Sequence, residues 1–209
     1  MPNRFTAIVD YGLCNIDSIT RAVEELGAKA ERTRDPQDIQ RADRIILPGV
    51  GSFGAAMKNL VEWHLADAIC ERVTNFDVPF LGICLGMQLM ATSGEEHGHH
   101  AGLGLIPGTV VQLQRQTSED RIPHMGWNEV HLKRNSPLFE SIAPGSDFYF
   151  VHSYHFQATD AQSEICHTPY CDGLTSAIQL SDRPIYGTQF HPEKSQRPGR
   201  QLLRNFLEA

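Results

Sequence analysis

The sequence predicts an α/β fold with three layers: a mostly parallel central sheet, helices on both of its faces, and a mixed or antiparallel extension. Two observations predict it. In the first half of the 209 residues, apolar β-leaning runs alternate with helical patterns, which is typical of βαβ units and a parallel sheet. From Thr109 onward, shorter predicted strands are separated by turn residues, which favours an antiparallel or mixed region joined to the same sheet.

The elements of the first half follow one another closely. The first strand is expected at residues 5–9. A helix follows it and ends at Gly27, because four apolar residues recur at helical spacing: Ile16, Ile19, Val23 and Leu26. Asp35 and Pro36 are typical of a helix N-cap and first helical residue. A strand at 45–47, helical stretches between Ala55 and Val73, and a strand before Cys84 complete the series.

The second half has weaker patterns. Residues 98–108 are rich in glycine and histidine and predict a long loop. The clearest strand is expected at 147–156. Residues 200–207 predict a closing helix with three core-facing residues: Leu202, Leu203 and Phe206. The sequence contains no repeats or low-complexity tracts, so we expect one domain over residues 1–209.

Composition narrows the functional classes. A hydrophobic content of 41% and a charged content of 21% are ordinary for a globular enzyme. The net charge of -7 without a basic stripe argues against nucleic acid as a partner. No apolar run approaches the roughly 20 residues of a membrane span. Residues 1–4 lead directly into the first strand, which argues against a signal peptide, and an odd number of cysteines fits reduced thiols. We therefore expect a cytoplasmic protein without membrane contact.

Cys84 carries the strongest functional signal. It lies between Gly82 and Gly86, after the apolar run 78–81 and before a helical pattern at 87–91. A strand, a sharp turn and a helix with a nucleophile at the apex form a nucleophile elbow, here with cysteine as the nucleophile. Taken alone, the motif also fits a buried structural cysteine.

His191 and Glu193 supply what a cysteine nucleophile needs. A thiol requires a base, and the base requires a group that orients it. We expect Pro192 to hold the chain extended between them, so that both side chains project to one side. An isolated His-Pro-Glu run is weak evidence. Together with the elbow, it predicts a catalytic triad of Cys84, His191 and Glu193.

A glycine-rich turn sharpens the reaction class. Residues 48–51 (PGVG) follow the strand at 45–47 directly. Their backbone N–H groups, with that of Leu85 beside the nucleophile, could form an oxyanion hole for acyl transfer. The alternative is an ordinary strand-to-helix turn. A phosphate-binding loop is not expected, because no Gly-Lys-Ser/Thr follows.

Several longer runs accompany these motifs: residues 10–12 (DYG), 47–53 (LPGVGSF), 82–88 (GICLGMQ), 123–128 (PHMGWN), 149–154 (YFVHSY) and 189–196 (QFHPEKSQ). On these residues the chain resembles the class I (triad) glutamine amidotransferases, and among them the glutaminase subunits of imidazole glycerol phosphate synthase. The resemblance spans nearly the whole chain. It implies the mostly parallel, helix-covered sheet of that family.

The resemblance also implies roles for residues. Cys84 would attack the side-chain amide of glutamine, His191 would pass a proton to the departing ammonia, and the thioester would be hydrolysed to glutamate. The oxyanion region would comprise Gly49, Val50, Gly51 and Leu85. The residues around bound glutamine would be Gln88, His152, Ser153 and Tyr154. The residues toward a partner subunit would be Trp127, Asn128, Tyr149 and Lys194. For Trp127 and Tyr149, plain core packing is the alternative.

In that family the ammonia passes to a partner subunit, which is a (β/α)8 barrel that acts as cyclase in histidine biosynthesis. The resemblance therefore implies a heterodimer, and we expect no cofactor. The family keeps the isolated glutaminase nearly silent. We hypothesise that a peptide flip in residues 49–51, which glycine makes cheap, is the switch that the partner and its ligand control.

Two other clusters could suggest a metal: Cys166, His167 and Cys171, and His97, His99 and His100. Neither has a second well-spaced ligand pair, so we expect a strand edge, a polar loop and no metal.

The chain departs from the family pattern in two places, and alternatives follow. Cys14 stands where a glycine is usual, and residues 168–173 replace a shorter turn. A related branch of the family supplies ammonia for amidination of surface-polysaccharide sugars, and this is the main alternative function. Two further alternatives are a non-catalytic subunit that retains the fold and a cysteine hydrolase acting on peptides or glutamyl chains.

Overall fold

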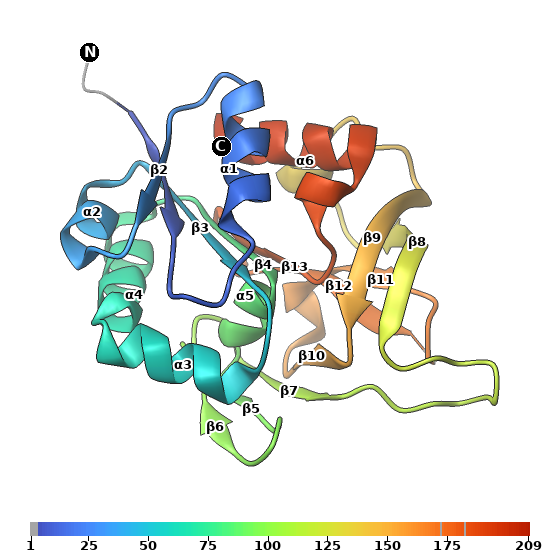
Figure 1. Cartoon of the computed structure of the whole chain (residues 1–209). Helices are drawn as coiled ribbons and strands as arrows, with labels where there is room; N and C mark the ends of the chain where they lie inside the picture. Colours follow the sequence, from blue (N-terminus) through green and yellow to red (C-terminus); the bar gives the residue numbers. More distant parts are fainter. Residues whose placement is uncertain (1–3, 172, 182) are drawn as a thin grey trace.

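The computed structural model describes residues 4–171, 173–181 and 183–209 (Figure 1). Its first half alternates strands and helices as predicted. The strands are β1 (Thr6–Val9), β2 (Ala30–Thr33), β3 (Arg44–Gly49) and β4 (Phe80–Cys84). The helices are α1 (Ile16–Glu25), α2 (Pro36–Arg41), α3 (Phe53–Glu62), α4 (Leu65–Phe76) and α5 (Leu85–Leu89). As expected, Asp35 caps α2 by accepting a hydrogen bond from the Gln37 N–H, and Pro36 begins that helix.

The second half is mainly β-structure. Its strands are β5 (Ser93–Gly94), β6 (His100–Ala101), β7 (Gly108–Gln112), β8 (His124–Leu132), β9 (Ser146–His152), β10 (Tyr154–Ala158), β11 (Glu164–Thr168), β12 (Leu174–Gln179) and β13 (Ile185–Thr188). Short 3₁₀ turns occur at η1 (Pro137–Phe139), η2 (Ala161–Ser163) and η3 (Pro192–Lys194), and the closing helix is α6 (Gln196–Glu208).

A large mixed sheet organises the molecule. Within the described residues its strand order is β2-β1-β3-β4-β13-β12-β11-β8-β9. The strands from β2 to β13 pair in parallel, and the remaining pairs are antiparallel. The prediction of a parallel core with an antiparallel extension of the same sheet is therefore confirmed. Because β13 returns from the end of the chain to lie beside β4, it brings the residues after it next to Cys84.

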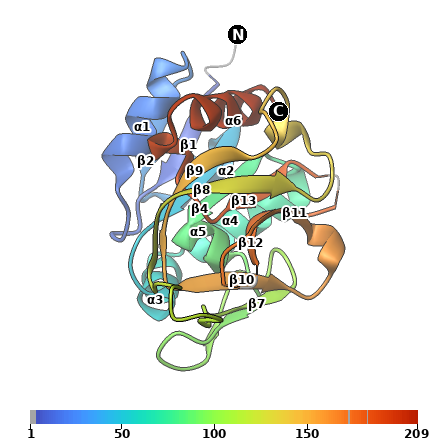
Figure 2. The ribbon, with the colours of Figure 1, turned by 90° about the vertical axis from the view of Figure 1, so that its right-hand side faces the viewer.

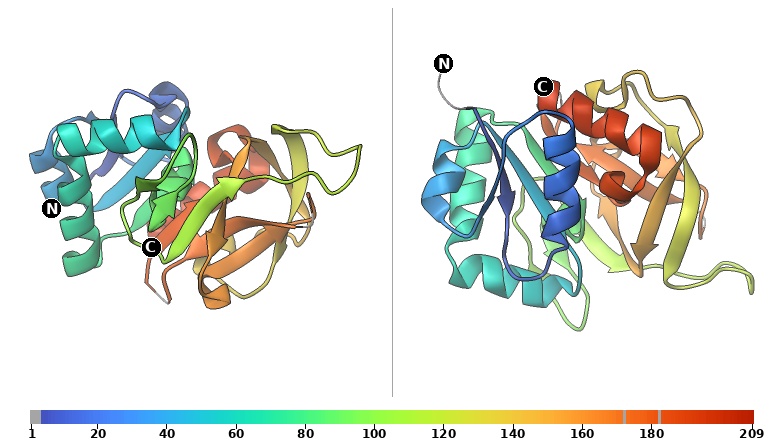
Figure 3. Two further views of the ribbon diagram at one scale, coloured as in Figure 1. Left: turned by 90° about the horizontal axis from the view of Figure 1, so that it is seen from below. Right: turned by 45° about the horizontal axis from the view of Figure 1, so that its top comes forward.

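Helices cover both faces of the sheet, as predicted (Figures 1 and 2). One apolar core joins the sheet to α2, α3, α4 and α5. A second core on the opposite face joins it to α1 and α6, and includes Leu202, Leu203 and Phe206 as expected. The views in Figure 3 show the β-rich half beside these layers, with the loop between β7 and β8 projecting from it. Among the helices of the described residues, none is long and apolar enough to cross a membrane.

The predicted single strand at 147–156 is wrong. The chain breaks at Ser153, and its two halves join different sheets: β9 pairs with β8, whereas β10 pairs with β7 in a second sheet of order β10-β7-β5-β6. The buried residues Phe148, Phe150 and Phe156 keep the same even spacing across the break. A period-2 pattern therefore looks continuous although the strand is not.

Two boundaries also differ from expectation. The closing helix begins at residue 196 instead of 200, so that Pro198 and Gly199 lie in its first turns. The glycine- and histidine-rich segment 98–108 is mostly loop, but His100 and Ala101 pair with β5. Helix-breaking residues are tolerated near a helix start, which explains why the sequence pattern placed this boundary too late.

Candidate active site

Cys84 lies at the sharp turn between β4 and α5, as the elbow motif predicts. Its backbone has φ 53° and ψ −108°, a conformation that a non-glycine residue rarely adopts and that typically costs about 1–3 kcal/mol. The neighbouring glycines make the turn possible. A Cβ on Gly82 would lie 2.6 Å from the carbonyl oxygen of Gly86, and a Cβ on Gly86 would collide with the Leu47 carbonyl. The strain and the close approach of backbone explain the G-x-C-x-G pattern.

His191 and Glu193 follow β13 and form the pair that the sequence predicts. The His191 Nδ1 atom lies 2.8 Å from Glu193 Oε1, and both side chains are buried. The expectation of an extended chain between them is wrong, because Pro192 begins the 3₁₀ turn η3. That turn still places the two side chains together, because His191 remains extended and the turn reverses the chain behind it.

The electrostatics of His191 favour its charged form. Burial acts against a charge on the ring, but the nearby Cys84 sulfur and the hydrogen-bonded Glu193 carboxylate outweigh it and raise the pKa of His191 to about 10. The Nε2 atom is buried and has no hydrogen-bond partner of good geometry among the described residues. Its interaction with Cys84 is therefore one of charge and proximity in this state. The arrangement keeps a proton available beside the thiol.

A cavity of about 270 Å³ opens at the Cys84 thiol. Seven residues predicted for the oxyanion region and glutamine pocket line it: Val50, Gly51, Leu85, Gln88, His152, Ser153 and Tyr154. Gly49 does not line the cavity but pairs with Cys84 across β3 and β4. The break between β9 and β10 thus lies at the edge of this cavity.

Two polar residues at the site were not predicted. Glu96 lines the cavity, and its carboxylate accepts a hydrogen bond from the Phe53 N–H at the start of α3, at 2.7 Å. Gln189 is fully buried; its Nε2 lies 3.7 Å from Cys84 Sγ, and its Oε1 accepts from Gln88 Nε2 at 3.1 Å. The position of Gln189 two residues before His191 was an available signal. Glu96 lies in a loop, and the residue pattern of that loop gave no signal of a site residue.

The glycine-rich turn is not arranged as an oxyanion hole. The Val50 N–H donates to the Leu13 carbonyl at 2.9 Å and is therefore not available to an oxygen at Cys84. Gly51 has φ +107°, which only glycine adopts easily. The neighbouring Cys14 does not reach the triad: its thiol lies 3.6 Å from Asp10 Oδ1, and burial together with that carboxylate raises its pKa to about 12.

The four residues expected at a partner interface fall into two groups. Trp127 is 47% exposed, so it is not a core residue, and its ring meets Tyr149 edge to face at 6.0 Å. Lys194 Nζ lies 5.7 Å from the Tyr149 ring centroid. These three side chains therefore lie together. Asn128 differs, because its amide is turned inward to His124, at 3.3 Å.

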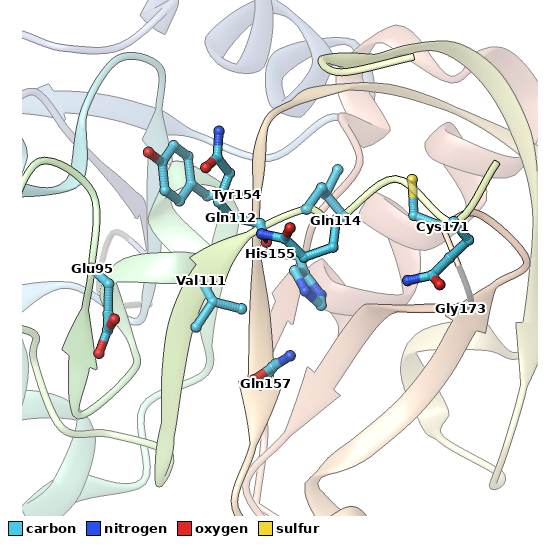
Figure 4. A pocket seen from close by; sticks show the side chains of 11 residues that line it. Glu95, Val111, Gln112, Gln114, Tyr154, His155, Gln157, Cys171 and Gly173 are labelled. Carbon is cyan, nitrogen blue, oxygen red and sulfur yellow. Dashed lines mark hydrogen bonds between the residues drawn. The ribbon is translucent and has the colours of Figure 1, made fainter. Parts of the chain in front are cut away.

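Larger cavities exist elsewhere. One of about 510 Å³ shares Tyr154 with the cavity at Cys84 and is lined mainly by amide and other polar side chains, including Gln112, Gln114, His155 and Gln157 (Figure 4). It contains no member of the triad. Within the described residues, no group of three or more His, Cys, Asp or Glu side chains could hold a metal ion. The cavity at Cys84 combines a thiol on a strained turn with space for a small substrate, whereas His191 and Glu193 lie outside its lining.

Comparisons with known proteins agree with this geometry. The pattern of the family "Glutamine amidotransferase class-I" matches residues 7–209. Solved structures show the same fold: a putative GMP synthase component from Thermoplasma acidophilum has a TM-score of 0.76 at 20% identity and covers 100% of this chain and 94% of that one. The structure of PurLQS from Thermotoga maritima has a TM-score of 0.75 at 17% identity, over 99% and 98% of the two chains.

Sequence relatives are more specific. An imidazole glycerol phosphate synthase subunit HisH from Moorella thermoacetica is 46% identical over 202 residues, covering 97% of this chain and 93% of the relative. A subunit HisH 1 from Campylobacter jejuni is 44% identical over 201 residues, covering 96% and 98%. The chain therefore belongs to the class I glutamine amidotransferases and, within that class, to the family of the HisH subunits of imidazole glycerol phosphate synthase.

Proposed function

We propose that this chain is the glutaminase subunit of an imidazole glycerol phosphate synthase and that Cys84, His191 and Glu193 are its catalytic residues. The observation that carries the proposal is the strained elbow at Cys84 with a buried His191–Glu193 pair beside it. The relatives with 40–46% identity over nearly their whole length support the assignment to this synthase.

The chemistry follows from the roles of the three residues. The Cys84 thiolate attacks the side-chain amide carbon of glutamine, and the carbonyl becomes a negatively charged oxygen. When this intermediate collapses, the C–N bond breaks, and the departing ammonia takes a proton from His191. Water then attacks the thioester and gives its proton to His191, which releases glutamate and regenerates Cys84. Glu193 keeps the Nδ1 proton of His191 in place throughout.

The negative oxygen needs donors that the resting turn does not offer. Leu85 N–H lies at the start of α5, next to Cys84. A flip of the Gly49–Val50 peptide would break the bond from the Val50 N–H to Leu13 and turn this donor toward Cys84. One such donor typically accounts for a roughly 10²–10³-fold difference in rate. The proposed switch is therefore large enough to keep the isolated chain nearly silent.

The partner in this proposal is a (β/α)8 cyclase subunit that receives the ammonia in histidine biosynthesis. The exposed side chains of Trp127 and Met125, with Tyr149 and Lys194 close by, support an interface on this face. Met125 and Trp127 are 64% and 47% exposed, which is unusual for such large apolar residues.

The experiment measures glutamate release by the chain alone, and then with the histidine-pathway barrel subunit of the same cell and its nucleotide ligand. We expect a strong rise with the partner, coupled to imidazole glycerol phosphate formation, and no release by a Cys84→Ala variant that still binds the partner. If Cys84 reacts with a glutamine-like electrophile but this partner neither binds nor stimulates, the polysaccharide-type partner becomes the better assignment. If Cys84 is not labelled in the assembled complex, the catalytic role is wrong.

A further inference from the structure

Two buried histidines connect the cavity at Cys84 with strand β8. His152 ends β9 and lines the cavity. His124 begins β8 and is the register partner of His152. The residues are only 3% and 6% exposed, for His124 and His152 respectively. Neither the triad nor the proposed mechanism uses His124.

The hydrogen bonds of this pair allow only one arrangement of protons. His152 Nδ1 lies 2.9 Å from the Tyr154 carbonyl oxygen, which can only accept, so Nδ1 carries the proton. In a neutral ring, Nε2 of His152 is then the acceptor, and His124 Nδ1, at 3.1 Å, must donate to it. His124 Nε2 in turn accepts from Asn128 Nδ2 at 3.3 Å. The orientation of the Asn128 amide is fixed because its oxygen accepts from the Glu129 N–H at 2.9 Å.

The environment keeps both rings neutral. Burial lowers the pKa of His124 to about 4. Burial and then the proximity of His124 lower the pKa of His152 to about 3. A proton on His152 Nε2 would point at the proton on His124 Nδ1, so two donors would meet without an acceptor between them. The neutral state is therefore the one in which each bond of the series has a donor and an acceptor.

The series continues to the nucleophile. The Tyr154 carbonyl that accepts from His152 also accepts from Gln88 Nε2 at 2.8 Å. Gln88 bonds Gln189, whose amide reaches Cys84 Sγ. One carbonyl oxygen thus joins the histidine pair to the two glutamine side chains beside the thiol.

We propose that His124 is a positioning residue of the glutamine site: its Nδ1–H holds His152 and the adjoining edge of the cavity at Ser153 and Tyr154, and Asn128 fixes the tautomer of His124 that does so. This inference rests on the proposed function and deepens it. Asn128 thereby acts through its inward amide, in addition to any contact with a partner.

His124 also has a packing role, which the test must separate from hydrogen bonding. Its ring lies between Phe150 and Tyr170, at centroid distances of 4.7 and 3.9 Å. Tyr170 belongs to the segment 168–173 that departs from the family pattern. Its hydroxyl donates to the Arg121 carbonyl at 2.6 Å and accepts from the Arg121 N–H at 3.0 Å, so the stack is firmly held.

Two substitutions separate these roles in the assembled heterodimer. His124→Phe keeps a ring between Phe150 and Tyr170 but removes the donor to His152. His124→Asn loses the ring but keeps an N–H at about the position of Nδ1. We expect His124→Phe to lower kcat/KM for glutamine by about tenfold or more, mainly through KM, because a buried acceptor is left unpaired. His124→Asn should retain activity within about threefold. The reverse order would show that His124 only packs, and would overturn the proposal.

A second measurement does not depend on activity or on the variants folding. In the free wild-type chain labelled with ¹⁵N-histidine, His152 should show a protonated Nδ1 and an unprotonated Nε2 from about pH 5 to pH 8, and so should His124. A His152 that carries its proton on Nε2 would overturn the proposal. If the wild-type heterodimer releases no glutamate, the proposed function fails, and the tautomers still decide the positioning claim.

Discussion

The groups on the two sides of Cys84 differ in whether the folded chain already holds them in the arrangement that the proposed reaction needs. On one side, the adjacent strands β4 and β13 bring Cys84 beside a His191–Glu193 pair that is already bonded and buried. On the other side, the turn at residues 49–51 points its Val50 N–H away, to the Leu13 carbonyl. The comparison teaches that the proposed nucleophile and base are already held together by the sheet, whereas in the proposed mechanism the turn must reorient before it can stabilise the negative oxygen.

The contrast has a physical basis. Cys84 ends β4, and His191 and Glu193 follow β13; both are central strands with neighbours on both sides, and all three side chains are buried. Val50 is 40% exposed, and one hydrogen bond with a typical net strength of about 1 kcal/mol holds its N–H. In the proposed mechanism, a partner would therefore need little differential binding energy to shift the turn.

The largest expected effect concerns the buried His191–Glu193 pair. Glu193→Gln removes the carboxylate that helps to raise the pKa of His191 to about 10. We expect glutamate release by the heterodimer to fall about 10²–10⁴-fold, because the amide no longer stabilises the imidazolium. The alkaline limit of the pH–rate profile should also move to lower pH. Glu31→Gln, which breaks a surface ion pair with Lys29 at the edge strand β2, is the control. Equal rates for the two variants would show that His191 needs no orienting group.

The next effect tests the turn. Val50→Pro removes the N–H that is bound to Leu13 at rest and that the proposed flip would direct to the oxyanion. Stimulated glutamate release should fall about 10²–10³-fold, whereas the low rate of the isolated chain should change little. Val50→Ala keeps the N–H and should retain stimulation. If Val50→Pro were stimulated as strongly as Val50→Ala, the Val50 N–H would not be the oxyanion donor. The contrast between a preformed His191–Glu193 pair and a turn that reorients would then be wrong.

The free energy of unfolding should fall both below and above neutral pH. The pKa values of His124 and His152, about 4 and about 3, lie below the usual 6.5, so below pH 6.5 the unfolded chain binds protons that the folded chain excludes, and stability falls. The raised pKa of His191 has the opposite sign: its contribution is complete below pH 6.5 and is lost as the pH rises toward about 10.

Urea unfolding at about pH 5, 7 and 9.5 checks this expectation. The free energy of unfolding should be greatest near neutral pH. His191→Gln should reduce only the loss of stability at alkaline pH. His124→Asn should reduce the loss of stability at acid pH. An alkaline decline that persists unchanged in His191→Gln would mean that the buried pair does not carry it.

The smallest effect concerns the hydroxyl of Tyr11. It is fully buried beside Gly49 and has no hydrogen-bond partner among the described residues, and burial raises its pKa well above the usual range. Tyr11→Phe should leave the denaturation midpoint unchanged or raise stability by up to about 1 kcal/mol. Tyr170→Phe, which loses two bonds to Arg121, should instead lower it. A clear loss in Tyr11→Phe would mean that this hydroxyl is bonded in the resting turn.

The elements and residues that could be predicted from the sequence are those with local causes. Glycines at fixed distances from Cys84 are required by close backbone contacts, and the alternation of strands and helices follows from burial on both faces. The break at Ser153 was missed because spacing by two continues through it. The inward turn of Asn128 depends on the side chain of His124, which is buried for reasons that the local pattern does not show. The contribution of Glu96 depends on the Phe53 N–H, 43 residues earlier in the sequence. The direction of the Val50 N–H depends on a contact with a distant carbonyl, which no local pattern records.

The neighbouring positions of β4 and β13 have a consequence for the order of events during synthesis. Gln189 touches the Cys84 thiol although 105 residues separate them along the chain. A ribosome therefore completes the elbow long before it releases the strand that carries the base. Since β13 inserts between β4 and β12, the sheet cannot close until that late strand arrives. A nascent chain that lacks β13 therefore holds Cys84 without His191 and Glu193 beside it.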